Sequence, residues 1–138
     1  MSEENNNITQ VQDAIQLPLT VRTLGKWIYQ TLSADSGVSA LVGSKVSPFL
    51  TREPKNLPWI VWDNVDIRYA RDKDINDADT ASFIITCAAA TVDDSYALAD
   101  AVVAAVNDKN SCRVDSIRAY WQEEVGMIQE INVTIDLY

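Results

Sequence analysis

The chain has 138 residues, 47% of them hydrophobic, and its 20 acidic and 11 basic side chains give a net charge of −9. This length predicts one domain that can bury a core without disulfide or metal support, and the acidic balance argues against sequence-independent binding of nucleic acid. The sequence contains no histidine, which excludes serine–histidine and cysteine–histidine catalysis and the HExxH zinc site.

The ends and the hydrophobic runs of the chain favour a soluble protein. No apolar run approaches the roughly 18 residues that a membrane span needs. The start, MSEENNNITQ, is acidic and amide-rich and lacks the features of a signal peptide. We therefore expect synthesis in a cytoplasm, no contact with a membrane, and reduced cysteines at Cys87 and Cys112.

Residues 1–16 are polar, and we expect a flexible segment there, followed by a single domain at 17–138. A helix is predicted over residues 20–34, where apolar side chains recur at the spacing of one helix face. These side chains are Val21, Leu24, Trp27, Ile28 and Leu32. Gly25 weakens this helix by about 1 kcal/mol relative to alanine, so we expect a neighbour to approach closely there.

A short capped element follows the first helix. Asp35 can accept hydrogen bonds from the free backbone donors of a new helical turn, and Gly43 can adopt the backbone conformation that ends it. A short strand is predicted at 45–47, and a loop with three prolines then leads to an apolar strand that starts at Trp59. This segment therefore orders the chain without supplying catalytic groups.

Four longer strands are predicted from apolar runs and from alternation of apolar and polar residues. They occupy 59–69, 80–91, 112–122 and 127–137. A helix is predicted over 91–106, with Thr91 and Asp94 as its capping box. Together the elements predict an α+β domain: a mainly antiparallel four- to five-stranded sheet with two helices packed on one face.

The helix at 91–106 has more apolar surface than one sheet face can cover. From Tyr96 to Val106 the only charged residue is Asp100. Either the first helix of the same chain or a neighbouring subunit covers the remainder, and small side chains would let another backbone come close. Ala97, Ala101 and Ala104 are therefore candidates for a subunit interface.

A helix end, a capped element and a leucine–proline strand entry follow one another in this chain. The residues are Leu32, Ala34, Asp35, Val38, Ala40, Leu41, Val42, Gly43, Leu57 and Pro58. Further on, the strand FIITCAAAT (83–91) precedes the helix SYALADAVVAAV (95–106). This order resembles the bacteriophage tail completion, or tail terminator, family over most of residues 20–138.

The resemblance implies a structural virion protein without enzymatic activity or cofactor. It implies the same α+β architecture and a homo-oligomeric ring of six copies that ends the tail tube and joins the tail to the head. The implied partners are the tail tube protein and the head–tail connector protein, and DNA passes through without specific binding. The location is the neck-proximal end of the tail in the virion, after assembly in the host cytoplasm. The alternatives are another ring-forming neck protein and an enzyme or metal-binding module that uses carboxylates.

The acidic segment RDKDINDADT contains the most tempting chemical motif. Asp72, Asp74, Asp77 and Asp79 are spaced like the start of a calcium loop. An EF-hand loop starting at Asp72 needs glycine at position 77 and glutamate at position 83, where this chain has Asp77 and Phe83. The segment is either a solvated hairpin loop or a loop that projects into a ring channel or toward a partner.

The remaining candidates favour packing over catalysis. The adjacent pairs Asp93–Asp94 and Glu123–Glu124 point in different directions in regular structure, so they cannot share a proton as a catalytic dyad. Trp59 and Trp62 face opposite sides of their strand. We expect one of them in the core and the other at a subunit contact, where aromatic anchors are enriched.

Overall fold

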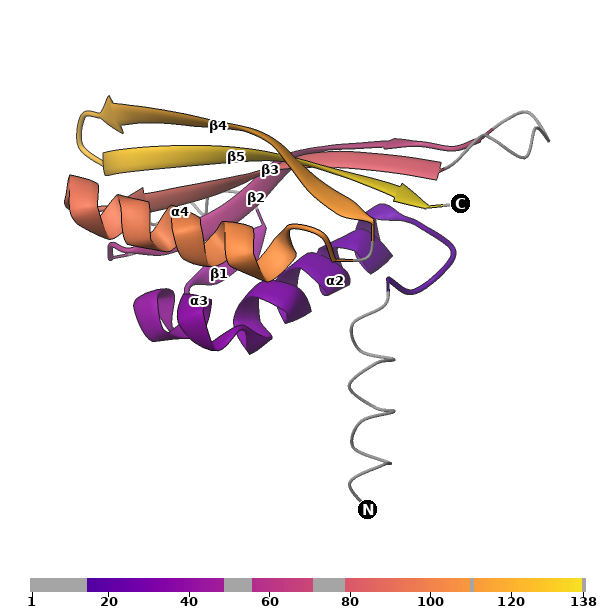
Figure 1. Cartoon of the computed structure of the whole chain (residues 1–138), viewed down its shortest axis with the longest axis horizontal. Coiled ribbons are helices and arrows are strands. Elements are labelled where there is room, and N and C mark those ends of the chain that lie inside the picture. Colours follow the sequence, from indigo (N-terminus) through magenta and orange to yellow (C-terminus); the bar gives the residue numbers. More distant parts are fainter. Residues whose placement is uncertain (1–14, 49–55, 71–78, 110, 138) are drawn as a thin grey trace, which may run out of the picture.

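The computed structural model describes residues 15–48, 56–70, 79–109 and 111–137. They form a five-stranded sheet with strand order β1-β2-β3-β5-β4, and the helices cover one face of it (Figure 1). In chain order the elements are α2 (Val21–Ala34), α3 (Ser36–Val42), β1 (Val46–Pro48), β2 (Trp59–Arg68), β3 (Asp79–Ala89), α4 (Val92–Val106), β4 (Cys112–Gln122) and β5 (Gly126–Leu137).

The predicted α+β class is confirmed, but the described helices on the sheet number three, so the expectation of two is corrected. The additional helix is α3, which the capped element after α2 forms. The Asp35 carboxylate accepts a 3.0 Å hydrogen bond from the Val38 backbone N–H, and Gly43 ends the helix at a φ of +62°. Val38 and Val42 are buried, so this short helix is held by packing as well as by its caps.

Local chemistry also sets the ends of the two longer helices. At the start of α2, Thr20 and Thr23 form a reciprocal capping box, with bonds of 3.1 Å and 2.8 Å. At the start of α4 the Thr91 hydroxyl accepts a 3.1 Å bond from the Asp94 N–H, as the sequence predicts. The Asp94 side chain does not return a bond to the Thr91 backbone N–H, so the cap is one-sided.

The sheet is antiparallel except at one edge, where β1 runs parallel to β2. Along β3 and β5, buried apolar side chains alternate with partly buried ones, because one sheet face lies under the helices. Phe83, Ile85, Ile131, Val133 and Ile135 thus belong to the main core with the buried faces of α2, α3 and α4.

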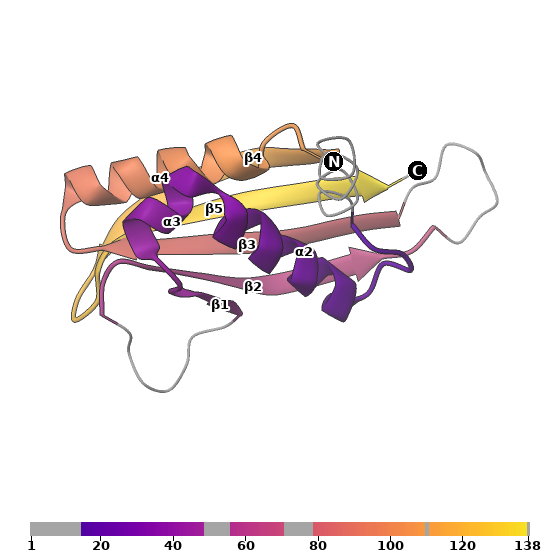
Figure 2. The same ribbon diagram turned by 90° about the horizontal axis from the view of Figure 1, so that it is seen from below.

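The helices divide the covered sheet face between them. Figure 2 shows α2 crossing β3 and β2, and α4 toward the opposite edge beside β5 and β4. The helix α2 also contacts β1. A Cβ at Gly37 in α3 would lie 3.9 Å from the Cβ of Ala101, so α4 packs against a helix of its own chain on that side. Of the two covers expected for the apolar surface of α4, the one within the chain was the first helix, α2. In the structure α3 packs on this flank of α4, and α2 also contacts α4.

Two glycines stand where a neighbour comes close. A Cβ at Gly25 would lie 3.9 Å from the ring of Trp62, an ordinary contact, so a neighbour is close but not tight. Gly126, which begins β5 at a φ of +136°, is far more constrained. A Cβ there would lie only 2.6 Å from the Ala89 carbonyl oxygen.

Candidate functional site

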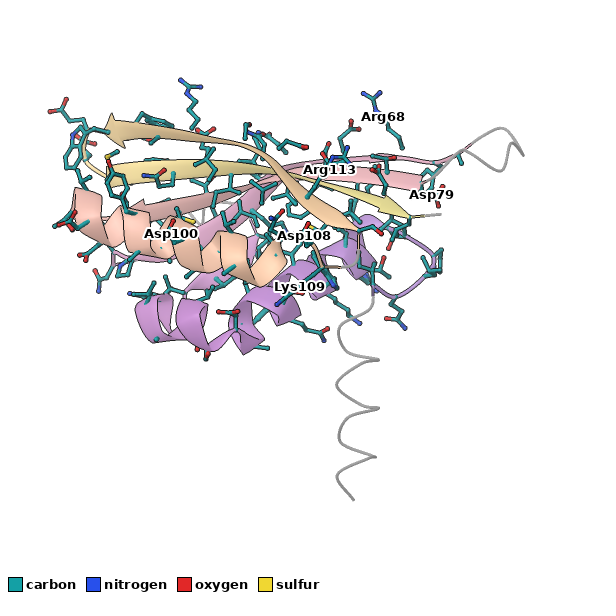
Figure 3. The ribbon with its side chains drawn as sticks, viewed as in Figure 1. Arg68, Asp79, Asp100, Asp108, Lys109 and Arg113 are labelled. Carbon is teal, nitrogen blue, oxygen red and sulfur yellow. The ribbon has the colours of Figure 1, made fainter. Side chains whose placement is uncertain are left out.

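Most of the predicted acidic loop falls outside the described residues, since Asp72, Asp74 and Asp77 lie in 71–78. Asp79 begins β3, and its carboxylate accepts a 2.8 Å hydrogen bond from the Ala70 backbone N–H. This bond joins the two strand ends at the base of the loop. Figure 3 shows Asp79 at that end of the sheet, where Arg68 also lies. Asp79 therefore has a local structural role, and the channel-facing role of the loop stays a prediction.

The two tryptophans of β2 lie on opposite sheet faces, as predicted. Trp62 is 5% exposed and belongs to the main core. Trp59 is 6% exposed and belongs to a second cluster on the helix-free face, where Leu57, Tyr120 and Val125 pack against it. Both side chains are thus covered within one chain, and a subunit contact at either stays a prediction.

The three candidate interface alanines on α4 differ in how exposed they are. Ala97 and Ala104 are exposed, whereas Ala101 is partly buried beside Gly37 of α3. Ala101 therefore supports packing between helices of one chain. Only Ala97 and Ala104 offer free surface to another subunit.

The helix-free sheet face carries a polar cluster that the sequence did not single out. The Tyr120 hydroxyl donates a 2.6 Å hydrogen bond to the Glu130 carboxylate, and the Arg118 guanidinium carbon lies 5.2 Å from the centre of the Tyr120 ring. The bond to Glu130 raises the pKa of Tyr120 above its ordinary value. The pKa of Asp63 on β2 is also raised, mainly by partial burial and to a lesser extent by the negative charge of Glu130.

Asp63, Tyr120 and Glu130 line a pocket of about 170 Å³. Trp59, Val61 and Ile128 of the second apolar cluster line it as well. The carboxyl groups of Asp63 and Glu130 could act as general acids or bases there, but the lining side chains include no nucleophile that they would activate. Within the described ranges, no group of three or more acidic or cysteine side chains is placed to hold a metal ion. The arrangement therefore fits a polar surface better than a reaction centre.

The cysteines are free and buried, which confirms the expectation of reduced thiols. Burial raises the pKa of the Cys87 thiol to about 12 and that of Cys112 to about 12. Both thiols are therefore neutral at physiological pH and unsuited to nucleophilic chemistry. Among the helices that the structure describes, none is long and apolar enough to cross a membrane.

A family model for the tail completion protein gp17 matches residues 26–127, which is well over half of the chain. The chain belongs to the tail completion protein gp17 family. This is a family of structural, non-enzymatic proteins, and the chain is a tail component of a phage-like virion. The resemblance inferred from the sequence is thereby confirmed.

A solved structure supports the same fold for this tail completion family member. One chain of the virion of a native gene transfer agent particle aligns with a TM-score of 0.67 and 20% sequence identity. The alignment covers 80% of this chain and 90% of that chain. No curated protein sequence matches.

For a structural virion protein the most relevant surface residues are exposed apolar side chains, and most of these were missed. On α4 and β4 they are Val92, Tyr96, Ile117 and Trp121. The sequence does indicate that Ile117, Ala119 and Trp121 share one strand face, because they recur at a two-residue spacing. It does not indicate that this face is exposed, since buried strands show the same spacing.

Proposed function

We propose that copies of this chain form a ring that ends the tail tube and joins the tail to the head connector. The observation that carries the proposal is membership of the tail completion family over residues 26–127. The fold shared with a chain of a gene transfer agent virion supports it. The tail tube protein and the connector protein are the proposed partners, six is the proposed copy number, and residues 17–138 are the proposed ring-forming domain.

The acidic balance of the chain suits a ring through which DNA moves. The net charge of −9 opposes the phosphate contacts that would hold DNA in place. We place the loop with Asp72, Asp74 and Asp77 at the channel or its rim, where repeated carboxylates repel the passing phosphates. Asp79 at its base keeps the loop ends together.

The direct test is complementation of a phage that lacks this gene. We expect filled heads and separate tails to accumulate, and expect the full-length chain to restore joined particles when it is supplied. Electron micrographs of the two populations give the joined fraction. Joined, infectious particles without the protein would contradict the proposal.

A second candidate is another ring-forming protein of the neck, because the small α+β fold and the acidic balance suit that role as well. The two differ in which component they hold. Isolated tails that carry the chain at their head-proximal end would favour the tail terminator. Filled heads that carry it before tails are added would favour the neck protein.

A further inference from the structure

Exposed apolar side chains line the edge of the molecule between α4 and β4. Asn107, at the end of α4, accepts a 3.2 Å hydrogen bond from the backbone N–H of Val114 in β4, so its side of the helix faces β4. Tyr96 lies eleven residues earlier, which is close to three full helical turns, and therefore lies on the same side. Ala101 faces the other way, toward α3. Val92, four residues before Tyr96, lies along the same flank.

The strand side of this surface comes from β4. Ile117 pairs with the core residue Ile131 of β5, and Trp121 pairs with Met127, so both point to the helix-covered face. They remain 49% and 62% exposed because β4 diverges from α4 toward its end (Figure 1). We call Val92, Tyr96, Ile117 and Trp121 the α4–β4 strip.

A second apolar surface lies at the opposite edge of the sheet. Val21, Gly25 and Tyr29 follow one another at four-residue spacing along α2, on the flank next to Trp62 of β2. The Tyr69 hydroxyl, just after β2, donates a 2.8 Å bond to the Leu19 carbonyl in the segment before α2. The surface consists of Leu17, Val21, Tyr29 and Tyr69, all of them exposed, and we call it the α2 flank.

These two surfaces account for eight of the nine large apolar side chains that are exposed in the described residues, and Leu41 on α3 is the ninth. Such clustering differs from scattered surface hydrophobics, which need no explanation. Because the surfaces lie on opposite edges, a copy that offers one of them still has the other free (Figure 2).

The charges beside the two surfaces are complementary. Acidic side chains border the α4–β4 strip, with Asp100 on α4 and Glu123 in the turn after β4, and Figure 3 shows Asp100 on the outer side of its helix. Beside the α2 flank, Arg22 and Lys26 stand one turn apart on α2. All four are exposed and form no ion pair within the described ranges.

We propose that the α4–β4 strip of one copy packs against the α2 flank of the next copy, head to tail. Contact between two different surfaces closes into a ring where the rotation from copy to copy is a whole fraction of a turn about one axis. A two-fold contact of strip with strip would instead bring the acidic side chains Asp100 and Glu123 against acidic side chains. The proposal rests on the ring of the proposed function and names its subunit interface.

The first test removes contacts without touching the core. Trp121→Ala is expected to weaken self-association of the full-length chain at least tenfold, since exposed tryptophans at such contacts act as anchors. Leu41→Ala is the matched control and should change it less than twofold. Sedimentation velocity over a range of concentrations, and binding to tails that lack the protein, measure both.

The second test exchanges charges. Asp100→Lys with Glu123→Lys should weaken association at least tenfold at low salt. Addition of Arg22→Glu and Lys26→Glu in the same chain should restore it to within about threefold. Circular dichroism confirms that each variant is folded.

The third test reads the direction of the contact. Trp121→Cys and Tyr29→Cys proteins, mixed and treated with a short bis-maleimide, should give a cross-linked dimer, whereas each alone should give none because the native cysteines are buried. Rings that persist in the Trp121→Ala and charge variants would contradict the proposed interface but not the ring itself. Cross-linked dimers from Trp121→Cys alone would do the same. A wild-type chain that stays single both in solution and on tails would overturn both.

Discussion

Replacement of Gly126 by alanine should destabilise the fold more than any other single-methyl addition at the described glycines. The residue has a φ of +136°, and a Cβ there would lie 2.6 Å from the Ala89 carbonyl oxygen and 3.2 Å from Leu57 Cδ1. Backbone strain of this kind costs about 1–3 kcal/mol. Relief of the overlap with a backbone atom adds about 1–3 kcal/mol, because β3 and β5 must separate where Ala89 pairs with Met127.

Gly43→Ala is the matched control. It shares a positive φ, at +62°, but an added Cβ there meets no atom within 4 Å. We therefore expect losses of about 4 kcal/mol for Gly126→Ala and about 2 kcal/mol for Gly43→Ala. For a chain of this size, these losses lower the melting temperature by about 15 °C and about 7 °C.

Thermal unfolding followed by circular dichroism, with urea titration as a second method, measures both variants against the wild type. The comparison isolates the backbone overlap, because the conformational cost is common to the two. A melting temperature of Gly126→Ala within 3 °C of the wild type, or equal losses for the two variants, would refute the reasoning.

Four other predictions concern the N-terminal segment, the cysteines, Asp63 and the acidic loop. Deletion of residues 1–12 should shift the melting temperature by less than about 5 °C, whereas deletion through Leu19 should lower it more, because Leu19 is buried in the core. Thiol titration with a disulfide reagent at pH 8 should detect no reactive cysteine before unfolding and two after it, and rapid native labelling would contradict the burial. Asp63→Asn should stabilise the fold at neutral pH. The pKa of Asp63 is raised in the folded state, so ionisation of this carboxyl opposes folding above that pKa. In urea titrations the gain in free energy of unfolding should vanish as the pH falls below the ordinary pKa of 3.8. Triple replacement of Asp72, Asp74 and Asp77 by lysine should leave the melting temperature nearly unchanged but reduce DNA ejection or the joining of tails to heads. The triple asparagine variant should give an intermediate reduction. Normal infectivity of the lysine variant would show that the loop is only a solvated turn.

Much of the fold could be predicted because its signals are local. The strand predicted at 112–122 is β4 to the residue, and the helices predicted at 20–34 and 91–106 each begin one residue later in the structure. Caps at Thr20 and Thr91 mark those starts through side-chain oxygens that bond within the first turn. Such features depend only on neighbours in the chain.

The features that sequence did not provide depend on strand order and twist. The tyrosine–glutamate bond of Tyr120 and Glu130, and the effect of Glu130 on Asp63, arise because β5 lies between β3 and β4. The exposure of Trp121 arises because β4 diverges from α4, which no local pattern reports. The parallel pairing of β1 with β2 likewise needs the tertiary fold.

The most direct test of the central claim is an electron cryomicroscopy reconstruction of the particle neck, without imposed symmetry, from virions that contain the chain. The account predicts a closed ring of copies around the tail axis between the tube and the connector, with the α4–β4 strip of each copy against the α2 flank of the next. A single copy off the tail axis would contradict it.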